Sequence, residues 1–143
     1  MTTTTKPYVV CYRGVAHPWL CDQLGHFNTR HYMAAYDDAM QHFFAIVGYK
    51  KQDGYGWADV RHEIEYRAEI APGALFHIDA ALIRVGGKSI TYHQRIILTD
   101  SNVVASTNKA TTVLFDLEKR AAVTAPSIIS DNAGQFTVPD DAL

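Results

Sequence analysis

The sequence predicts an α+β domain in which one long central helix is wrapped by a curved antiparallel sheet. Three observations support this fold class. Residues 28–47 form a long and nearly all-apolar helical segment, residues 58–69 alternate strictly between two kinds of side chain, and three strand-like runs separated by short turns follow. A helix that is apolar over most of its circumference must be covered by other elements. An antiparallel sheet with one apolar face supplies that cover.

The first two elements are a strand and the helix. Residues 8–15 are rich in aromatic and β-branched side chains, which predicts the first strand. Asn28 or Thr29 can cap the start of the helix, no proline interrupts it, and Gly48 supplies the left-handed residue that ends it. We interpret the apolar face of the helix as ordinary core.

The rest of the sheet follows the helix along the chain. In residues 58–69 the predicted apolar face consists of Ala58, Val60, His62, Ile64, Tyr66 and Ala68. The later strands are predicted at residues 75–85, 89–99 and 103–116, with turns at Pro72-Gly73, Gly86-Gly87 and residues 100–102. Strands joined by short turns are antiparallel neighbours. Together with residues 8–15 and 58–69, these three strands give a sheet of about five strands. One helix leaves a sheet edge and the far face uncovered, which predicts a homodimer or a dimer of dimers.

Composition limits the class of protein. With 143 residues, 48% hydrophobic and 20% charged, the chain fits one domain over residues 1–143, with a core at about 8–126 and an irregular C-terminal tail. Thirteen basic residues against 15 acidic ones give a net charge of -2, so we expect no nucleic-acid partner.

Location is constrained by what the sequence lacks. No apolar run approaches the roughly 20 residues of a membrane helix, and residues 1–7 lack the apolar middle of a signal peptide. Cys11 and Cys21 are too few for a disulfide framework, although a single bridge stays open. We therefore expect a cytoplasmic protein without a membrane partner.

Residues that can carry chemistry are concentrated just before the helix. Residues 17–32 contain three of the seven histidines together with Trp19, Asp22 and Gly25. Loops that present such groups from a rigid scaffold are common functional sites. The first N–H groups of the helix carry partial positive charge, and they can stabilise the oxyanion that forms when a carbonyl is attacked.

The pattern Asp22-x-x-Gly25-His26-x-Asn28-x-x-x-Tyr32 before an apolar helix resembles the hotdog-fold acyl-CoA thioesterases of the 4-hydroxybenzoyl-CoA thioesterase type. The similarity extends over roughly residues 8–126. It includes Glu63-Ile64-Glu65-Tyr66, the Pro72-Gly73 turn, the hairpin and Val113-Leu114-Phe115-Asp116. The Gly-His-x-Asn variant resembles a subgroup associated with small polar acyl-CoAs. The resemblance implies hydrolysis of a small acyl-CoA to the free acid and CoA.

The resemblance also implies roles for the loop residues. Asp22 would be the catalytic carboxylate, as nucleophile or as general base, and the backbone amides around Asn28 and Thr29 would form the oxyanion site. An aspartate is ionised at neutral pH and can attack directly, whereas as a base it is weak unless burial favours its protonation. Gly25 would allow the tight turn. His26 would orient Asp22 or a water, or assist the leaving thiol, and its alternative role is only to shape the loop.

Four further residues are candidate substrate contacts: Trp19, Tyr32, His62 and Lys88. Three of them also have a simpler interpretation. Tyr32 suits packing in the core, and His62 suits a hydrogen-bonded core histidine, although in this fold its face borders the substrate tunnel. Lys88 suits a solvated turn or a contact with a CoA phosphate. No cofactor is expected, because CoA is part of the substrate.

Other enzyme classes fit the sequence less well. Residues 86–89 resemble the end of a phosphate-binding loop, but two strands flank them. We expect no metal site, because the sequence has neither a His-Glu-x-x-His nor a Cys-x-x-Cys pattern. Two alternatives to the thioesterase stay open. One is a hotdog enoyl-CoA hydratase or dehydratase in which His26 and Asp22 move protons, and the other is a non-catalytic acyl-CoA binding module.

Overall fold

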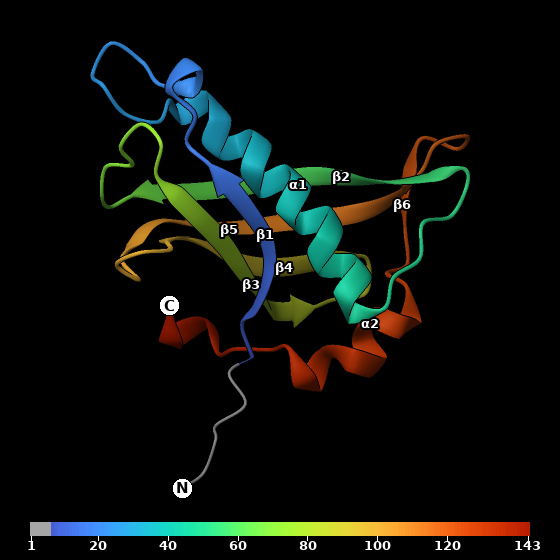
Figure 1. The fold of residues 1–143 in the computed structure, drawn as a ribbon. Coiled ribbons are helices and arrows are strands. Elements are labelled where there is room, and N and C mark those ends of the chain that lie inside the picture. The colour runs from blue at the N-terminus through green and yellow to red at the C-terminus, as the bar shows by residue number, and fades with distance from the viewer. Residues whose placement is uncertain (1–6) are drawn as a thin grey trace, which may run out of the picture.

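The computed structural model describes residues 7–143. Most of residues 1–7, for which the sequence predicts no signal peptide, therefore lies outside the described residues. Six strands form one antiparallel sheet in the order β1-β3-β4-β5-β2, with a short β6 paired to β5 (Figure 1). The strands are β1 (Val9–Val15), β2 (Tyr55–Tyr66), β3 (Leu75–Val85), β4 (Ser89–Leu98), β5 (Val104–Asp116) and β6 (Ala121–Val123). The predicted α+β fold class is confirmed.

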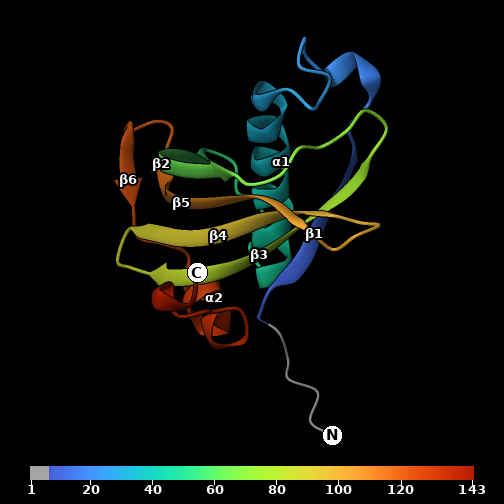
Figure 2. The ribbon, with the colours of Figure 1, turned by 90° about the vertical axis from the view of Figure 1, so that its left-hand side faces the viewer.

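The predicted helix is present as α1 (Thr29–Val47) and lies against the curved sheet (Figure 2). Both ends form as the sequence predicts. The Asn28 side chain accepts a hydrogen bond from the Arg30 N–H at 3.0 Å, and Gly48 ends the helix with φ 121°. The fully buried residues Tyr36, Phe43 and Phe44 fix the helix to the sheet. The start of α1 is thereby held at one end of the molecule.

Strand β2 departs from the predicted alternation because it contains a β-bulge. Asp59 pairs with Thr112 and Arg61 with Thr111, so Val60 has no partner in β5 and its surface is 63% exposed. An unpaired residue reverses the faces of all residues beyond it. Trp57 therefore packs on Phe44 of α1, with ring centroids 4.6 Å apart. The prediction that Ala58 and Val60 share the helix-facing side with His62 is wrong.

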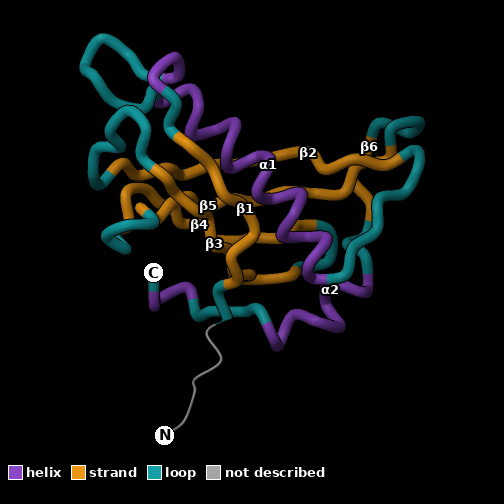
Figure 3. Tube along the Cα trace, viewed as in Figure 1, coloured by secondary structure: helices purple, strands orange, loops and turns teal. Residues whose placement is uncertain are grey.

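The prediction of an irregular C-terminal tail is also wrong. The tail contains α2 (Ser127–Asn132) and two short 3-10 helices (Figure 3). Within α2, Ile129 is fully buried. Strand β1 pairs with β3 only as far as Ala80, and beyond it the tail pairs with the free edge of β3. The Leu82 N–H donates to the Phe136 carbonyl at 2.7 Å. The Asn132 side chain also donates to the Val47 carbonyl at the end of α1.

Both cysteines are free thiols in the structure, so the single bridge that the sequence left open does not form. Burial, reinforced by Asp79, raises the pKa of Cys11 to about 12. Within residues 7–143 no helix is long and apolar enough to span a membrane.

A buried polar cluster lies on the face of the sheet opposite α1. The Arg95 guanidinium binds both carboxylate oxygens of Asp79, at 2.8 and 2.6 Å, and it stacks 3.7 Å from the Tyr8 ring. The Tyr8 hydroxyl lies 2.9 Å from His93 Nδ1. Burial, followed by the charge of Arg95, lowers the pKa of His93 to about 4. His93 is therefore neutral in the folded protein at neutral pH.

We predict that His93 makes the folded state less stable as the pH falls from about 6.5 to about 4. The unfolded chain takes up the proton near pH 6.5, whereas the folded chain takes it up only near its lowered pKa of about 4. Linkage gives a loss of roughly 2 kcal/mol after allowance for solvent screening. Urea unfolding at pH 7 and pH 4.5 should show a smaller loss in His93→Gln than in the parent. Equal losses in both proteins would contradict the prediction.

Candidate active site

The loop between β1 and α1 is held rigidly at both ends. The N–H of Phe27 donates to the Ile70 carbonyl at 2.8 Å, and the N–H of Asn28 donates to the Leu20 carbonyl at 3.0 Å. Within the stretch from Leu20 to Phe27, the Asp22 N–H donates to the His26 carbonyl at 3.1 Å. The loop therefore forms a closed turn whose position is fixed relative to the start of α1.

The Asp22 carboxylate is oriented by its own turn. Its Oδ1 accepts a hydrogen bond from the Leu24 N–H at 2.9 Å, which is an Asx turn. The Gly25 N–H donates to the Asp22 carbonyl at 2.9 Å. Gly25 has φ +80° and open space at the position of a Cβ, so the turn requires glycine for its backbone conformation and not for lack of room. The second oxygen of Asp22 accepts no hydrogen bond from residues 7–143, and it can therefore reach a substrate.

The start of α1 offers one backbone donor beside this carboxylate. Asn28 uses its N–H on Leu20, and its side chain caps the Arg30 N–H. The Thr29 N–H has no acceptor within the described residues. Unpaired N–H groups at a helix start carry partial positive charge and bind anions. Of the two amides predicted for the oxyanion site, the Thr29 N–H is the one that is free.

The predicted loop residues meet the end of β2 in a pocket of about 270 Å³. Asp22, His26, Thr29 and Tyr32 all line it, which brings together four of the predicted site residues. The opposite wall is formed by residues 66–69. The Tyr32 ring packs edge-on against Tyr66, with centroids 4.9 Å apart. Burial, followed by the neighbouring Tyr66 and the Asp22 carboxylate, raises the pKa of Tyr32 to about 12, so the Tyr32 hydroxyl stays protonated.

His26 lines the pocket without forming a pair with Asp22. Its Nε2 lies 3.8 Å from a carboxylate oxygen of Glu69, on the opposite wall. That separation is too long for a hydrogen bond. Asp22 and His26, the two predicted acid–base partners, share this pocket. Their side chains are not hydrogen-bonded to each other.

The other predicted contacts lie outside this pocket. Trp19 is 75% exposed and stacks on His17 with centroids 4.4 Å apart. Lys88 is on the β3–β4 hairpin, at the opposite end of β3 from the loop, so one chain does not bring it to the pocket. His62 lies on β2 before the strand reaches the pocket at Tyr66, and it hydrogen-bonds Asp59 and Asn108 at 3.0 Å each.

Two groups of residues at or near the site were missed by the sequence analysis. The pocket wall at residues 66–69 follows the strand predicted at 58–69, and only the fold places it opposite Asp22. Asp59 is not among the residues predicted for the apolar face of this strand, and the bulge at Val60 turns it inward. Gln94 is the sequence signal that could have revealed polar groups such as Asp59 beneath the helix. It is an uncharged polar residue two positions from Tyr92 and Ile96 on the apolar face of β4.

Comparison with known proteins places this geometry in a family. The model of the thioesterase-like superfamily matches residues 16–133. No curated protein matches the chain.

Solved structures share the fold at low identity. A hypothetical protein from Staphylococcus aureus, solved in complex with CoA, is 15% identical with a TM-score of 0.79, covering 94% of this chain and 92% of that one. A 1,4-dihydroxy-2-naphthoyl-CoA thioesterase from Synechocystis is 12% identical with a TM-score of 0.74, covering 90% and 97%. The probable thioesterase YbaW from Escherichia coli is 19% identical with a TM-score of 0.71, covering 88% and 97%.

These similarities confirm the predicted hotdog fold. The family model spans most of the chain and includes the loop, α1 and the pocket wall at residues 66–69. The chain therefore belongs to the thioesterase-like superfamily, a family of thioester hydrolases.

Proposed function

We propose that the chain hydrolyses an acyl-CoA thioester to the free acid and CoA, with Asp22 as the catalytic carboxylate. One observation carries the proposal. The Asp22 carboxylate and Thr29, whose N–H is free, line the same pocket at the start of α1. This arrangement supplies a negative group to attack or activate and a positive backbone group to receive the developing charge.

In the proposed reaction the thioester carbonyl lies between these two groups. Asp22 either attacks the carbonyl carbon, giving an anhydride that water hydrolyses, or removes a proton from a water that attacks. In both routes the carbonyl electron pair moves to oxygen, where the Thr29 N–H and the dipole of α1 stabilise it. The tetrahedral intermediate then collapses, the C–S bond breaks, and CoA leaves as the thiolate. Both routes therefore depend on the same carboxylate and the same donor.

The arrangement favours hydrolysis over hydration. A hydratase of the kind considered from the sequence needs His26 and Asp22 as paired acid and base. The only carboxylate near His26 Nε2 among the described ion pairs is that of Glu69, at 3.8 Å. Thioester cleavage needs no such pair, because one carboxylate performs both versions of the attack.

Several features support CoA as the carrier and a small acyl group. The Staphylococcus aureus neighbour was solved with CoA, and the Synechocystis neighbour acts on an acyl-CoA. The pocket of about 270 Å³ lies just below the usual range of about 300–1,000 Å³ for small-molecule sites. The free thiols Cys11 and Cys21 suit the reducing cytoplasm, where we place the reaction.

The protein is proposed to act as a homodimer or a dimer of dimers. Strand β2 is at the edge of the sheet and pairs only with β5 within the described chain. Val60 and Tyr66 on this strand are 63% and 51% exposed. A long edge strand with exposed apolar side chains is a template for pairing with a second copy. Such pairing would cover the open side of the pocket beside Tyr66.

Release of free thiol from a panel of acyl-CoAs tests the proposed activity. The panel varies acyl length, aromaticity and polarity, and the reaction is followed with a thiol-reactive dye. We expect turnover of at least one member, and the preferred acyl group then identifies the substrate class. Binding of CoA without any turnover would favour the non-catalytic module, and addition of water to a 2-enoyl-CoA without thiol release would favour the hydratase.

A further inference from the structure

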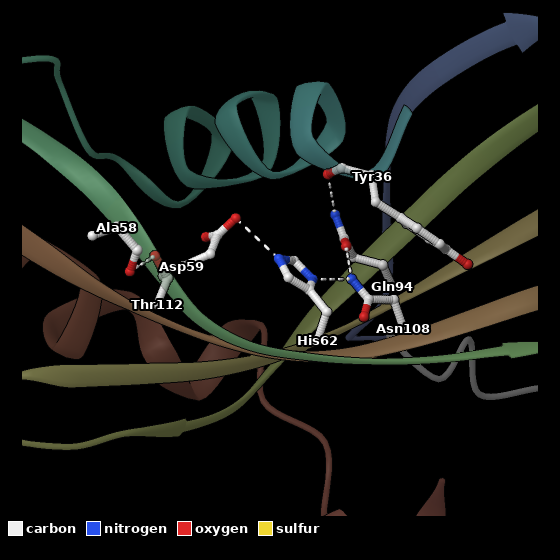
Figure 4. Close-up of polar contacts among 7 residues, drawn as sticks. All are labelled: Tyr36, Ala58, Asp59, His62, Gln94, Asn108 and Thr112. Atoms are coloured by element: carbon white, nitrogen blue, oxygen red, sulfur yellow. Dashed lines mark hydrogen bonds and ion pairs between the residues drawn. The ribbon is translucent and has the colours of Figure 1, made fainter. Parts of the chain in front are cut away.

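A chain of polar side chains lies between the middle of α1 and the sheet, outside the pocket of Asp22 (Figure 4). Gln94 Nε2 donates to the Tyr36 carbonyl at 2.8 Å, and Asn108 Nδ2 donates to Gln94 Oε1 at 2.9 Å. Asn108 Nδ2 also lies 3.0 Å from His62 Nδ1, and His62 Nε2 lies 3.0 Å from Asp59 Oδ2. Gln94 and Asn108 are completely buried.

The direction of every hydrogen bond in this chain is fixed by the Tyr36 carbonyl, which can only accept. Gln94 must present its amide N–H to that carbonyl and its oxygen to Asn108, and Asn108 must then present its N–H₂ group. His62 Nδ1 therefore accepts, and the ring proton is on Nε2, where it is donated to Asp59. Both ring nitrogens are occupied, so His62 is not arranged to act as a base. Its role is to position the Asp59 carboxylate.

The groups that remain free in this cluster are hydrogen-bond acceptors. Asp59 keeps one oxygen that accepts no bond from the described residues. Asn108 Oδ1 is buried and likewise accepts none from them. Asp37 of α1 adds a second carboxylate, and its pKa is raised by burial and then by the charges of Asp59 and Asp38, with His62 opposing. These free acceptors suit a ligand that donates a hydrogen bond, and they would repel a carboxylate.

The cluster is partly exposed and lies between α1 and β2, the two elements that also contribute Thr29, Tyr32 and Tyr66 to the pocket of Asp22. Strand β2 and α1 run in opposite directions: Tyr32 meets Tyr66 near the start of α1, and Phe44 meets Trp57 near its end. The side chains of Asp59 and His62 lie between these contacts and are 29% and 18% exposed. Asp37 is eight residues beyond Thr29, about 12 Å along the helix at 1.5 Å per residue. Where their side chains extend toward each other, the distance between the functional groups is shorter than these roughly 12 Å along the helix axis.

We propose that Asp59, positioned by His62, is a specificity-determining acceptor for a hydroxyl group at the far end of the acyl chain. The proposal rests on the proposed function, since it places the thioester carbonyl between Asp22 and Thr29. The acyl group then runs along α1 toward Asp37 and Asp59. The substrate class is a hydroxyacyl-CoA, and the site discriminates against acyl chains that end in a carboxylate.

The test compares kcat/KM for straight-chain acyl-CoAs from butanoyl to decanoyl, each unsubstituted, with a terminal hydroxyl, and with a terminal carboxylate. At the length that reaches Asp59, the hydroxyl should raise kcat/KM about tenfold, as expected for a hydrogen bond to a charged group. In Asp59→Ala this advantage should fall to about one. The matched control is Glu63→Ala, which removes an exposed carboxylate paired with Arg61 on the same strand. It should keep the advantage.

Asp59→Asn provides a test that does not depend on a tolerated cavity. Its oxygen can still accept from His62 Nε2, and its amide then donates outward, so the preference should move from the hydroxyl toward the carboxylate. Melting temperatures confirm that each variant is folded. A hydroxyl advantage near one at every length, or one unchanged in both Asp59 variants, would overturn the proposal. If no acyl-CoA is hydrolysed, the proposed function fails, and calorimetric binding of the same compounds to the parent and to Asp59→Ala still decides the role of Asp59.

Discussion

Asp22→Asn is expected to lower kcat/KM for thioester hydrolysis by roughly 10²- to 10⁴-fold, the range that a positioned acid–base group contributes. An amide neither attacks the carbonyl as a carboxylate does nor takes a proton from water. The asparagine oxygen can still accept from the Leu24 N–H, so the Asx turn and the start of α1 should keep their positions. The measurement is thiol release on the best substrate of the panel, with the melting temperature as a check on folding.

A matched variant separates this effect from a general one. The Asp116 carboxylate also accepts hydrogen bonds within its own turn, from the Glu118 and Lys119 N–H groups at 3.0 Å each. It lies at the end of β5, outside the pocket of Asp22. Asp116→Asn should therefore retain full activity. If Asp22→Asn were as active as Asp116→Asn, Asp22 would not be the catalytic carboxylate.

The parts of the fold that follow from local chemistry were predictable from the sequence. The Asn28 cap and the Gly48 end of α1 depend on residues next to one another in the chain, and both form as predicted. The same is true of the glycine hairpin between β3 and β4, where strands of the predicted lengths flank a short turn. Such features are stabilised within a few residues and do not need the rest of the molecule.

The bulge in β2 could not be read from the sequence pattern. Residues 58–69 alternate without interruption, and the extra residue is Val60, a good strand former. The cross-strand partners decide the register. Thr112 donates to the Ala58 carbonyl at 3.1 Å, and Trp57 packs against Phe44 and Tyr49. Tertiary packing thus places Asp59 on the helix-facing side, where an alternating pattern assigns it to solvent.

The candidate site was predictable in its loop and not in its opposite wall. The spacing from Asp22 to Tyr32 identified the residues that meet at the helix start, because that stretch is continuous in sequence. It could not tell that the Asn28 N–H is used by Leu20 while the Thr29 N–H stays free. It also could not place Glu69 beside His26, since that contact joins segments more than forty residues apart.

Ile129→Ala is expected to reduce the free energy of unfolding by about 2–5 kcal/mol, the usual cost of removing a buried isoleucine side chain. Ile129 is fully buried in a cluster that includes Met40, Phe43 and Leu82, so the truncation leaves a cavity between the tail, α1 and β3. Ile128 is its neighbour on the same short helix and is 39% exposed. Ile128→Ala should cost less than about 1 kcal/mol. Urea unfolding of both variants measures the difference directly.

The comparison decides whether the tail is part of the folded core. Both substitutions remove the same atoms from the same helix, so helix propensity changes equally and only burial differs. The pairing of Leu82 with the Phe136 carbonyl and of Asn132 with the Val47 carbonyl ties this segment to β3 and to the end of α1. Loosening the tail would therefore free the end of α1 that is opposite the site. Equal and small costs for the two variants would mean that the tail does not contribute to the core in solution.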